Sequence, residues 1–434
     1  MARALPITLR LYRGLSALVV PFVGLIIRRR LGRGKEDPER VQERRGIASV
    51  ERPPGPLIWI HGASVGEVLA AAELIEKLRA LGIRILLTSG TLTAASMVKR
   101  RFPPDVIHQY IPFDTPRFVN SFLDHWQPGL ALFIESDLWP NLILSASDQR
   151  IPMVVINGRM SPRSFPRWMR FRGTIGALLD CFDLCLAQSD LDADRYAALG
   201  SPNVATTGNL KLDVNPPPAD GRKLERLRTA TQRRMIFVAA STHAGEEEII
   251  LDAYRRLAGH FPALLAVIVP RHPGRGPAIA QSIAATGINV TLRSREELPS
   301  GNTEIYVADT MGELGLFYRL APVAFMGGSL VDHGGQNPIE AIKLGAAVLH
   351  GPNTYNFAEI YDTLDKAGGA LRTESDEHFV KSLGYMLANP VARQRATHAA
   401  EQVVERLGGA LEKTLIALEP YLLQMRIEAG ALDA

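Results

Sequence analysis

The chain has 434 residues, of which 46% are hydrophobic and 22% charged, with 37 glycines and 29 prolines. This composition is that of a globular protein, so it excludes the disordered and fibrous classes, and the length predicts two or three domains. The formal net charge is +4, but residues 1–54 hold 12 basic and 5 acidic side chains, a balance of +7, which leaves −3 on the rest. A nucleic-acid binder would spread positive charge over a folded face, so we expect no nucleic-acid partner.

The N-terminal segment is basic and apolar. Residues 1–30 contain six arginines and no acid, and an apolar run fills 14–27. This run is shorter than the roughly 20 residues of a full helical span, and arginines at 28–30 stand where a cleaved signal peptide would have small residues. Arginines that flank an apolar helix can reach the lipid headgroups of an anionic membrane. We predict a membrane-associating segment over 1–54, the alternative being a buried helix of the first domain.

Short apolar runs alternate with helical patterns along the rest of the chain, which predicts βαβ units and parallel sheets. A stretch with three consecutive prolines, 213–222, breaks every pattern and is the predicted linker. We therefore expect an N-terminal α/β domain over 55–212 and a C-terminal α/β domain over 223–434, both doubly wound and facing each other across a cleft. The predicted strands are 57–61, 83–89, 106–111, 130–134, 153–157, 183–187 and 204–207, then 235–240, 264–269, 288–292, 304–308, 323–325 and 346–349.

The two cysteines, Cys181 and Cys185, are too few for a disulfide scaffold or for a zinc site without other ligands. We expect both to be buried free thiols.

The first strand is followed by a Gly62-x-Ser64-x-Gly66 turn and then a helix. The pattern matches the nucleophile elbow of α/β-hydrolases, which makes Ser64 a candidate nucleophile. Against this, the turn follows the first strand and no downstream acid or histidine is marked as a triad partner. The same glycines also let a turn approach a ligand closely.

Glu67 begins the helix after this turn, where a carboxylate could take a proton from a substrate hydroxyl, although an acid in a first helical turn also stabilises the helix dipole. Glu135 and Asp137 follow a second buried strand, where they could share a site or cap a helix. Lys211 stands just before the linker, where it could reach into the cleft or be a solvated surface charge.

The second half offers groups that suit an anionic ligand. Arg271 ends a buried strand, and its guanidinium could bind phosphate or carboxylate. Four glycines, at 327–328 and 334–335, flank the approach to a helix that Asn337 would cap, and they leave room for a phosphate at its N-terminus. Glu340, one turn further, could accept two ribose hydroxyls. No dinucleotide-binding or Walker motif occurs at these turns.

Together these segments resemble the 3-deoxy-D-manno-octulosonic acid (Kdo) transferases of lipopolysaccharide synthesis. The resemblance spans nearly the whole chain in order, through residues 62–67, 135–141, 207–211, 241–247, 270–273, 309–314, 327–330 and 337–340. It implies an inverting, metal-independent GT-B glycosyltransferase with no cofactor, on the cytoplasmic face of the inner membrane. Such enzymes move Kdo from CMP-Kdo to a tetraacylated lipid A precursor, lipid IVA.

The resemblance also assigns roles to residues. Glu67 matches the general base, and Glu135 and Lys211 match groups that stabilise the transition state. Two positions depart from the family: Asp137 stands where a Glu is usual, and Gln336 replaces a frequent His. The implied donor-binding residues are Pro270, Arg271, Met311, Gly312, Glu313, Asn337, Pro338, Ile339 and Glu340.

Two other functions stay open beside the hydrolase reading. One is a GT-B transferase for another lipid or sugar, since the same fold hosts many specificities. The other is a membrane-associated nucleotide-binding protein without catalysis.

Overall fold

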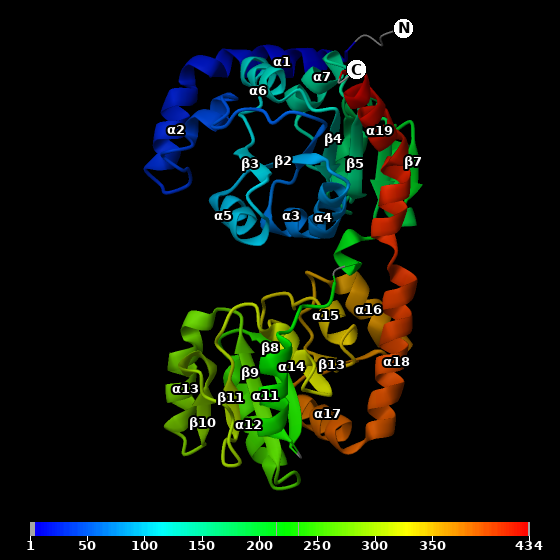
Figure 1. Ribbon diagram of the computed structural model, residues 1–434. Helices are drawn as coiled ribbons and strands as arrows, with labels where there is room; N and C mark the ends of the chain where they lie inside the picture. Colours follow the sequence, from blue (N-terminus) through cyan, green and yellow to red (C-terminus); the bar gives the residue numbers. More distant parts are fainter. Residues whose placement is uncertain (1–4, 214, 233, 433–434) are drawn as a thin grey trace. The chain divides into compact units, whose positions relative to one another are not determined.

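The computed structural model describes residues 5–213, 215–232 and 234–432, so Val214 of the predicted linker lies outside the described residues. The chain forms two compact units (Figure 1). Unit 1 comprises Met1–Asp213 and Leu407–Ala434, and unit 2 comprises Val214–Arg406. The predicted cleft between two domains stays a prediction.

Unit 1 is built on a parallel sheet in the order β3-β2-β1-β4-β5-β6-β7. The chain starts in the centre, at β1, and winds first to one edge and then to the other, so the order reverses between β1 and β4. All seven predicted strands are confirmed. They are β1 (Leu57–His61), β2 (Arg84–Ser89), β3 (Val106–Tyr110), β4 (Leu130–Ile134), β5 (Met153–Gly158), β6 (Leu184–Ala187) and β7 (Val204–Thr206).

Helices cover both faces of this sheet because its central strands are buried on both faces. Leu57 and Trp59 pack toward α6, α7, α9 and α10, whereas the alternate residues Ile58 and Ile60 pack toward α3, α4, α5 and α19. The helices of unit 1 are α1 (Ile7–Val19), α2 (Val23–Leu31), α3 (Val65–Ala70), α4 (Ala72–Ala80), α5 (Leu92–Arg101), α6 (Pro116–Trp126), α7 (Pro140–Asp148), α8 (Ser164–Arg170), α9 (Arg172–Leu179), α10 (Asp190–Leu199) and α19 (Ala410–Leu432), with short 3₁₀ turns η1 (Val20–Phe22), η2 (Val41–Arg45) and η3 (Leu210–Leu212).

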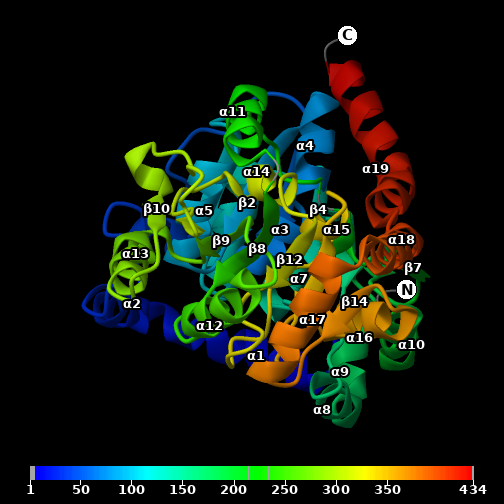
Figure 2. The same ribbon diagram turned by 90° about the horizontal axis from the view of Figure 1, so that it is seen from below.

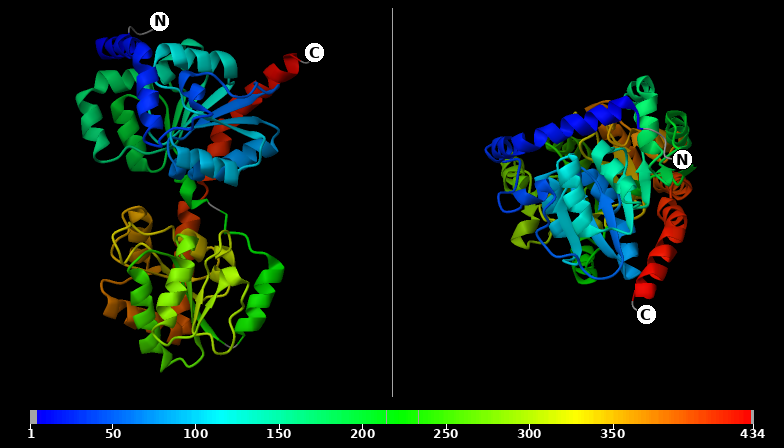
Figure 3. Two further views of the ribbon diagram at one scale, coloured as in Figure 1. Left: turned by 90° about the vertical axis from the view of Figure 1, so that its left-hand side faces the viewer. Right: turned by 90° about the horizontal axis from the view of Figure 1, so that it is seen from above.

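The N-terminal helices run along the outside of unit 1 (Figure 3, right). The stretch Ile7–Leu31 is long and apolar enough to cross a membrane, and only 11% of its most apolar window is buried. One side of the first helix is nevertheless hydrogen-bonded to the rest of unit 1. Tyr12 donates to Asp114 at 2.9 Å, and Asn141 donates to Ser16 at 2.9 Å. The segment therefore packs on unit 1 through one side, as the alternative interpretation predicted, and its association with a membrane stays a prediction.

The terminal helix α19 corrects one predicted boundary. The C-terminal domain was expected to run to residue 434, but the chain returns to unit 1 at Leu407. Ala410, Leu418, Leu422 and Met425 belong to the same apolar cluster as Ile58 and Ile60 of β1. Burial of this apolar face against the first sheet is the physical reason for the return.

Unit 2 repeats the architecture, with the sheet order β10-β11-β9-β8-β12-β13-β14 and all strands parallel. In Figure 2, α11 and α14 lie on one side of this sheet and α12 and α17 on the other. The six predicted strands are confirmed as β8 (Met235–Thr242), β9 (Leu264–Pro270), β10 (Val290–Leu292), β11 (Ile305–Val307), β12 (Val323–Met326) and β13 (Ala347–His350), and β14 (Ala370–Arg372) is additional. The helices are α11 (Gly221–Thr231), α12 (Glu246–Ala258), α13 (Gly276–Ala284), α14 (Leu314–Tyr318), α15 (Ile339–Ile342), α16 (Ala358–Ala367), α17 (Asp376–Ala388) and α18 (Pro390–Leu407), with η4 (Pro273–Arg275) and η5 (Arg293–Arg295).

Candidate active site

Three carboxylates gather at the carboxyl edge of the first sheet. Glu67 follows β1, and Glu135 and Asp137 follow β4, the neighbouring strand. Strand order reverses between these two strands, and open parallel sheets bind ligands outside such a reversal. The structure thus brings together the acids that the sequence placed after two separate strands.

Glu67 is held by its own helix N-terminus. Its Oε2 accepts a hydrogen bond from the Ala63 N–H at 2.7 Å, and its Oε1 accepts one from the Ser64 hydroxyl at 2.7 Å. Burial raises the pKa of Glu67; the two hydrogen bonds lower it, and the negative charges of Glu135 and Asp137 raise it further. A carboxylate with a raised pKa is a better proton acceptor, which suits a general base.

Ser64 does not have the surroundings of a hydrolase nucleophile. Its hydroxyl donates to Glu67 and accepts from the Glu67 N–H, which makes it the cap of α3. The nearby imidazole of His61 instead contacts Thr88 through Nδ1 at 2.9 Å and Asp137 through Nε2 at 3.1 Å. The predicted elbow is therefore a capping box, and among the described residues the hydrogen-bond partner of the Ser64 hydroxyl is the Glu67 carboxylate and not a histidine.

Glu135 and Lys211 form an ion pair, Nζ to Oε1, at 2.7 Å. The Glu135 backbone has a φ of +62°, a left-handed conformation that is uncommon for residues other than glycine, and Tyr196 donates a hydrogen bond to its carbonyl at 3.1 Å. Lys211 lies in η3, which Asn209 caps. The ion pair thus joins two residues 76 positions apart in the sequence, and the stabilising role that the resemblance implies for them stays a prediction.

An apolar cavity of about 440 Å³ adjoins this acidic edge. It lies between α1, α9 and the segment after β4, and Asp137 and Trp139 line it together with Leu9 and Trp168. A second cavity, of about 340 Å³, shares the lining residues Tyr12 and Trp139 with the first and is also lined by Val23 and Ile26. Apolar space therefore reaches from the N-terminal helices to a residue whose charge acts on Glu67.

The predicted donor residues lie at or after the carboxyl ends of strands in the second sheet. Arg271 is exposed just after β9, and its charge lowers the pKa of Glu340 on α15, although burial raises that pKa more. Asn337 caps α15 by accepting a hydrogen bond from the Ile339 N–H at 3.0 Å, as the sequence predicted. Pro270, Pro338 and Ile339 are buried and so can contribute shape or backbone only.

Met311, Gly312 and Glu313 form the turn before α14. The Met311 side chain is 72% exposed, and Gly312 has a φ of +78°, which a glycine adopts without strain. The Glu313 carboxylate is bound by Arg293, Lys223 and Thr310, and the hydrogen bonds from Arg293 contribute most to lowering its pKa to about 2. Since this carboxylate is fully engaged, a ligand would meet the backbone of the turn.

The glycine-rich loop after β12 is fixed from within unit 2. The backbone N–H groups of Gly328, Ser329 and Leu330 donate to the buried carboxylate of Glu246 at 2.7 to 3.1 Å. Glu246 also accepts from the His243 N–H at 2.9 Å. An internal carboxylate therefore fixes this loop, because buried N–H groups require partners. The phosphate site expected at the N-terminus of the helix after Asn337 stays a prediction.

Histidines that sequence reasoning gave no role converge beside this loop. The rings of His243, after β8, and His333, after β12, are stacked with centroids 4.1 Å apart. His272, after β9, lies edge-on to His243 at 6.3 Å. His243 and His272 lie in segments that carry the family resemblance, and all three histidines follow buried strands, but nothing in the sequence showed that residues up to 90 positions apart meet.

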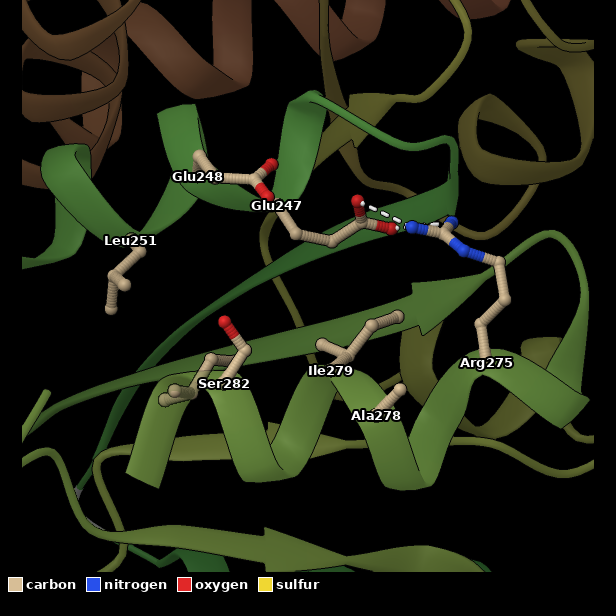
Figure 4. A pocket seen from close by; sticks show the side chains of 8 residues that line it. Glu247, Glu248, Leu251, Arg275, Ala278, Ile279 and Ser282 are labelled. Carbon is tan, nitrogen blue, oxygen red and sulfur yellow. Dashed lines mark hydrogen bonds and ion pairs between the residues drawn. The ribbon is translucent and has the colours of Figure 1, made fainter. Parts of the chain in front are cut away.

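A further cavity, of about 210 Å³, lies between α12 and α13 (Figure 4). There Glu247 and Arg275 point toward each other and pair through two hydrogen bonds of 2.9 and 3.0 Å. None of the predicted donor residues lines this cavity. In the described part of the chain no group of three or more His, Cys, Asp or Glu side chains is placed to hold a metal ion, and a metal-free reaction stays a prediction.

Comparison with known proteins identifies the family. Residues 39–214 match the family described as 3-deoxy-D-manno-octulosonic-acid transferase (kdotransferase). The transferase of that name from Haemophilus influenzae is 37% identical over 93% of this chain and 96% of its own length. A probable mitochondrial one from Arabidopsis thaliana is 35% identical over 93% of both chains.

A solved glycosyltransferase from Rickettsia africae is 14% identical, with a TM-score of 0.56 over 85% of this chain and 99% of that chain, a likeness of fold alone. The chain therefore belongs to the family of 3-deoxy-D-manno-octulosonic acid (Kdo) transferases, and its two parallel-sheet units have a GT-B-like glycosyltransferase fold.

Proposed function

We propose that this protein transfers Kdo from CMP-Kdo to a hydroxyl of a lipid A precursor, lipid IVA, with Glu67 as general base. The observation that carries the proposal is the position of Glu67: a half-buried carboxylate with a raised pKa at the strand-order reversal of unit 1. In the reaction, the acceptor oxygen bonds to the anomeric carbon of Kdo while the bond from that carbon to the CMP phosphate breaks. Glu67 takes the hydroxyl proton, and attack on the opposite face inverts the configuration.

In this proposal Glu135 and Lys211 stabilise the negative charge that develops on the departing phosphate. The ion pair places a cation on the Glu135 carboxylate, so Lys211 reduces the repulsion between the acidic edge and an anionic donor. A fixed cation that needs no reorganisation stabilises a departing phosphate most when water is excluded. The proposal does not require a metal.

The donor binds to unit 2 in this proposal. Glu340 accepts the ribose hydroxyls, the turn around Gly312 meets the base through its backbone, and the Arg271 guanidinium contributes positive charge. The charge of Arg271 acts on Glu340, which supports the proposal that both side chains bind the same ligand. The side chain of Glu313, held by Arg293, serves to shape this turn.

We propose that the N-terminal segment binds the cytoplasmic face of the inner membrane. Apolar side chains on one side of the helices are exposed, namely Ile7, Leu11, Leu15, Leu18, Phe22 and Leu25. Arg28, Arg29, Arg33 and Lys35, also exposed, follow this stripe and suit anionic headgroups. Because the other side hydrogen-bonds to unit 1, we propose that the helices lie on the membrane and do not span it.

The apolar cavities beside Trp139 support a lipid acceptor. They connect the membrane-facing helices with the acidic edge, so an acyl chain held there would bring its sugar headgroup toward Glu67. A soluble sugar acceptor would have no use for such space. This distinguishes the proposal from a GT-B transferase that acts on a water-soluble acceptor.

The test is to incubate the purified full-length protein with CMP-Kdo and lipid IVA and to measure product masses. A mass increase of one or more Kdo units is expected, and Glu67→Ala should abolish it while CMP still binds. CMP binding without any transfer by the wild-type protein would favour a non-catalytic nucleotide-binding protein. Transfer to another acceptor only would favour the second GT-B alternative.

A further inference from the structure

The stacked imidazoles of unit 2 lie where a ligand is expected. His243 follows β8 and His333 follows β12, two adjacent strands. The order of the second sheet reverses between them, because the chain runs from β8 outward through β9 and then returns to β12. Ligands of open parallel sheets bind outside the carboxyl ends of the strands at this reversal. His333 is exposed and His243 partly exposed, so both rings can be reached from solvent.

The groups that face His243 are predominantly cationic or neutral. His333 stacks on it, His272 lies edge-on, and the charges of Arg271 and Arg275 act on it. The amide Nε2 of Gln336 lies 3.5 Å from His243 Nε2. The nearest acids are occupied: Glu246 by backbone N–H groups and Glu247 by Arg275 and Thr242. The surroundings therefore favour an anion.

We propose that His243 and His333 bind the phosphate group of CMP-Kdo, and that His243 takes up a proton when the phosphate binds. This inference rests on the proposed function and adds residues to its donor site. The charge of Arg271 acts both on Glu340, which is proposed to bind the ribose, and on His243. Arg271 therefore links the proposed ribose site with the imidazole pair. The phosphate, which is attached to the ribose, is then the ligand group that reaches the imidazole pair.

The protonation follows from the charges. In the free protein, burial and the neighbouring His333, His272, Arg271 and Arg275 lower the pKa of His243, so the ring is neutral at pH 7. A bound phosphate brings negative charge and raises that pKa. Binding then takes a proton from solvent, and affinity falls as pH rises through the interval between the free and the bound pKa.

The experiment measures CMP and cytidine binding to the full-length protein by titration calorimetry between pH 6.5 and 8, in two buffers of different ionisation enthalpy. His243→Ala should weaken CMP binding about tenfold at pH 6.5, as expected for the loss of a charge-assisted hydrogen bond. Cytidine, which lacks the phosphate, should bind within twofold of wild type. His243→Gln keeps a donor but cannot titrate, so it should remove the proton uptake. His398→Asn, an exposed histidine of α18, is the matched control and should change nothing.

The phosphate of CMP titrates in the same way with every variant. A difference between variants in how CMP affinity changes with pH therefore reports His243 alone. Equal CMP affinity and equal proton uptake in wild type and His243→Gln would overturn the inference while leaving the proposed function intact. An equal loss for cytidine and CMP in His243→Ala would also overturn it, since His243 would then shape the pocket and not bind phosphate. A wild-type protein that binds neither ligand would overturn the proposed function as well.

Discussion

The two units have similar parallel sheets, yet the carboxyl edges of those sheets carry different side chains. In unit 1 the strand-order reversal gathers Glu67, Glu135 and Asp137 with one lysine. In unit 2 the corresponding reversal gathers imidazoles and the Arg271 guanidinium. The fold sets where side chains converge, and the residues at the strand ends decide which chemistry follows. An acidic edge suits proton removal from an acceptor, whereas a basic edge suits a phosphate leaving group.

Unit 2 also has acidic side chains near its strand ends. They differ from those of unit 1 in their hydrogen-bond partners. Glu246, Glu247 and Glu313 are each bound by several donors of their own unit, which removes them from the ligand side. In unit 1 the hydrogen bonds of Glu67 come from one helix N-terminus, and its pKa is still raised. Motif letters alone therefore do not separate a structural carboxylate from a reactive one, but hydrogen-bond partners do.

The largest effect is expected at Glu67. Glu67→Gln keeps the size and part of the capping hydrogen bonds but cannot accept the proton, so transfer should fall by about 10³-fold. The measurement is the single-turnover rate with lipid IVA, together with the affinity for CMP, which should not change. Activity within tenfold of wild type would mean that the acidic edge does not supply the base.

A smaller loss is expected at Lys211, about 10²-fold, since one preorganised charge would be removed from the developing negative charge. Lys211→Ala also leaves Glu135 without its ion pair, so Lys211→Arg serves as the matched variant that keeps the charge. If Lys211→Ala lowered thermal stability but not the rate, the pair would be structural only.

Glu340→Gln should act on the donor side alone. The loss of a carboxylate that accepts ribose hydroxyls should weaken CMP binding about tenfold, because hydrogen bonds to charged groups contribute roughly 1.5–3 kcal/mol. The KM for the lipid acceptor should stay unchanged. A shift in acceptor KM without a change in CMP affinity would contradict the division of roles between the units.

Much of the fold was predictable from the sequence because buried parallel strands form continuous apolar runs. Thirteen strands and the capping of α15 by Asn337 followed from such local signals. β14 was missed because Ala370–Arg372 holds only two apolar residues between two glycines and the charged Arg372, which is no continuous apolar run. The return of α19 to unit 1 was missed because an amphipathic pattern shows that a face is buried but not against which domain.

The sequence predicted the part of the candidate site in which the functional residue and its helix lie in one segment, as at Glu67. It did not predict contacts between loops that are distant in the sequence. The stack of His243 on His333 and the capture of the 328–330 N–H groups by Glu246 each join positions more than 80 residues apart. The glycines around this loop are equally consistent with an open phosphate cradle and with a loop fixed from within, and only the position of the Glu246 carboxylate separates the two.

The smallest expected effect, at Ser64, separates a capping residue from a nucleophile. Ser64→Ala removes the cap of α3 and should lower the free energy of unfolding by about 1 kcal/mol. It also removes a hydrogen bond that lowers the pKa of Glu67, so that pKa should rise further. The base acts only when deprotonated, and the acid limb of kcat/KM should therefore move to higher pH while the rate at pH 8 stays within a fewfold of wild type. Ser64→Thr, which keeps the hydroxyl, should restore the wild-type profile. Loss of all activity in Ser64→Ala at pH 8, with labelling of Ser64 by a serine-reactive probe, would instead favour the hydrolase.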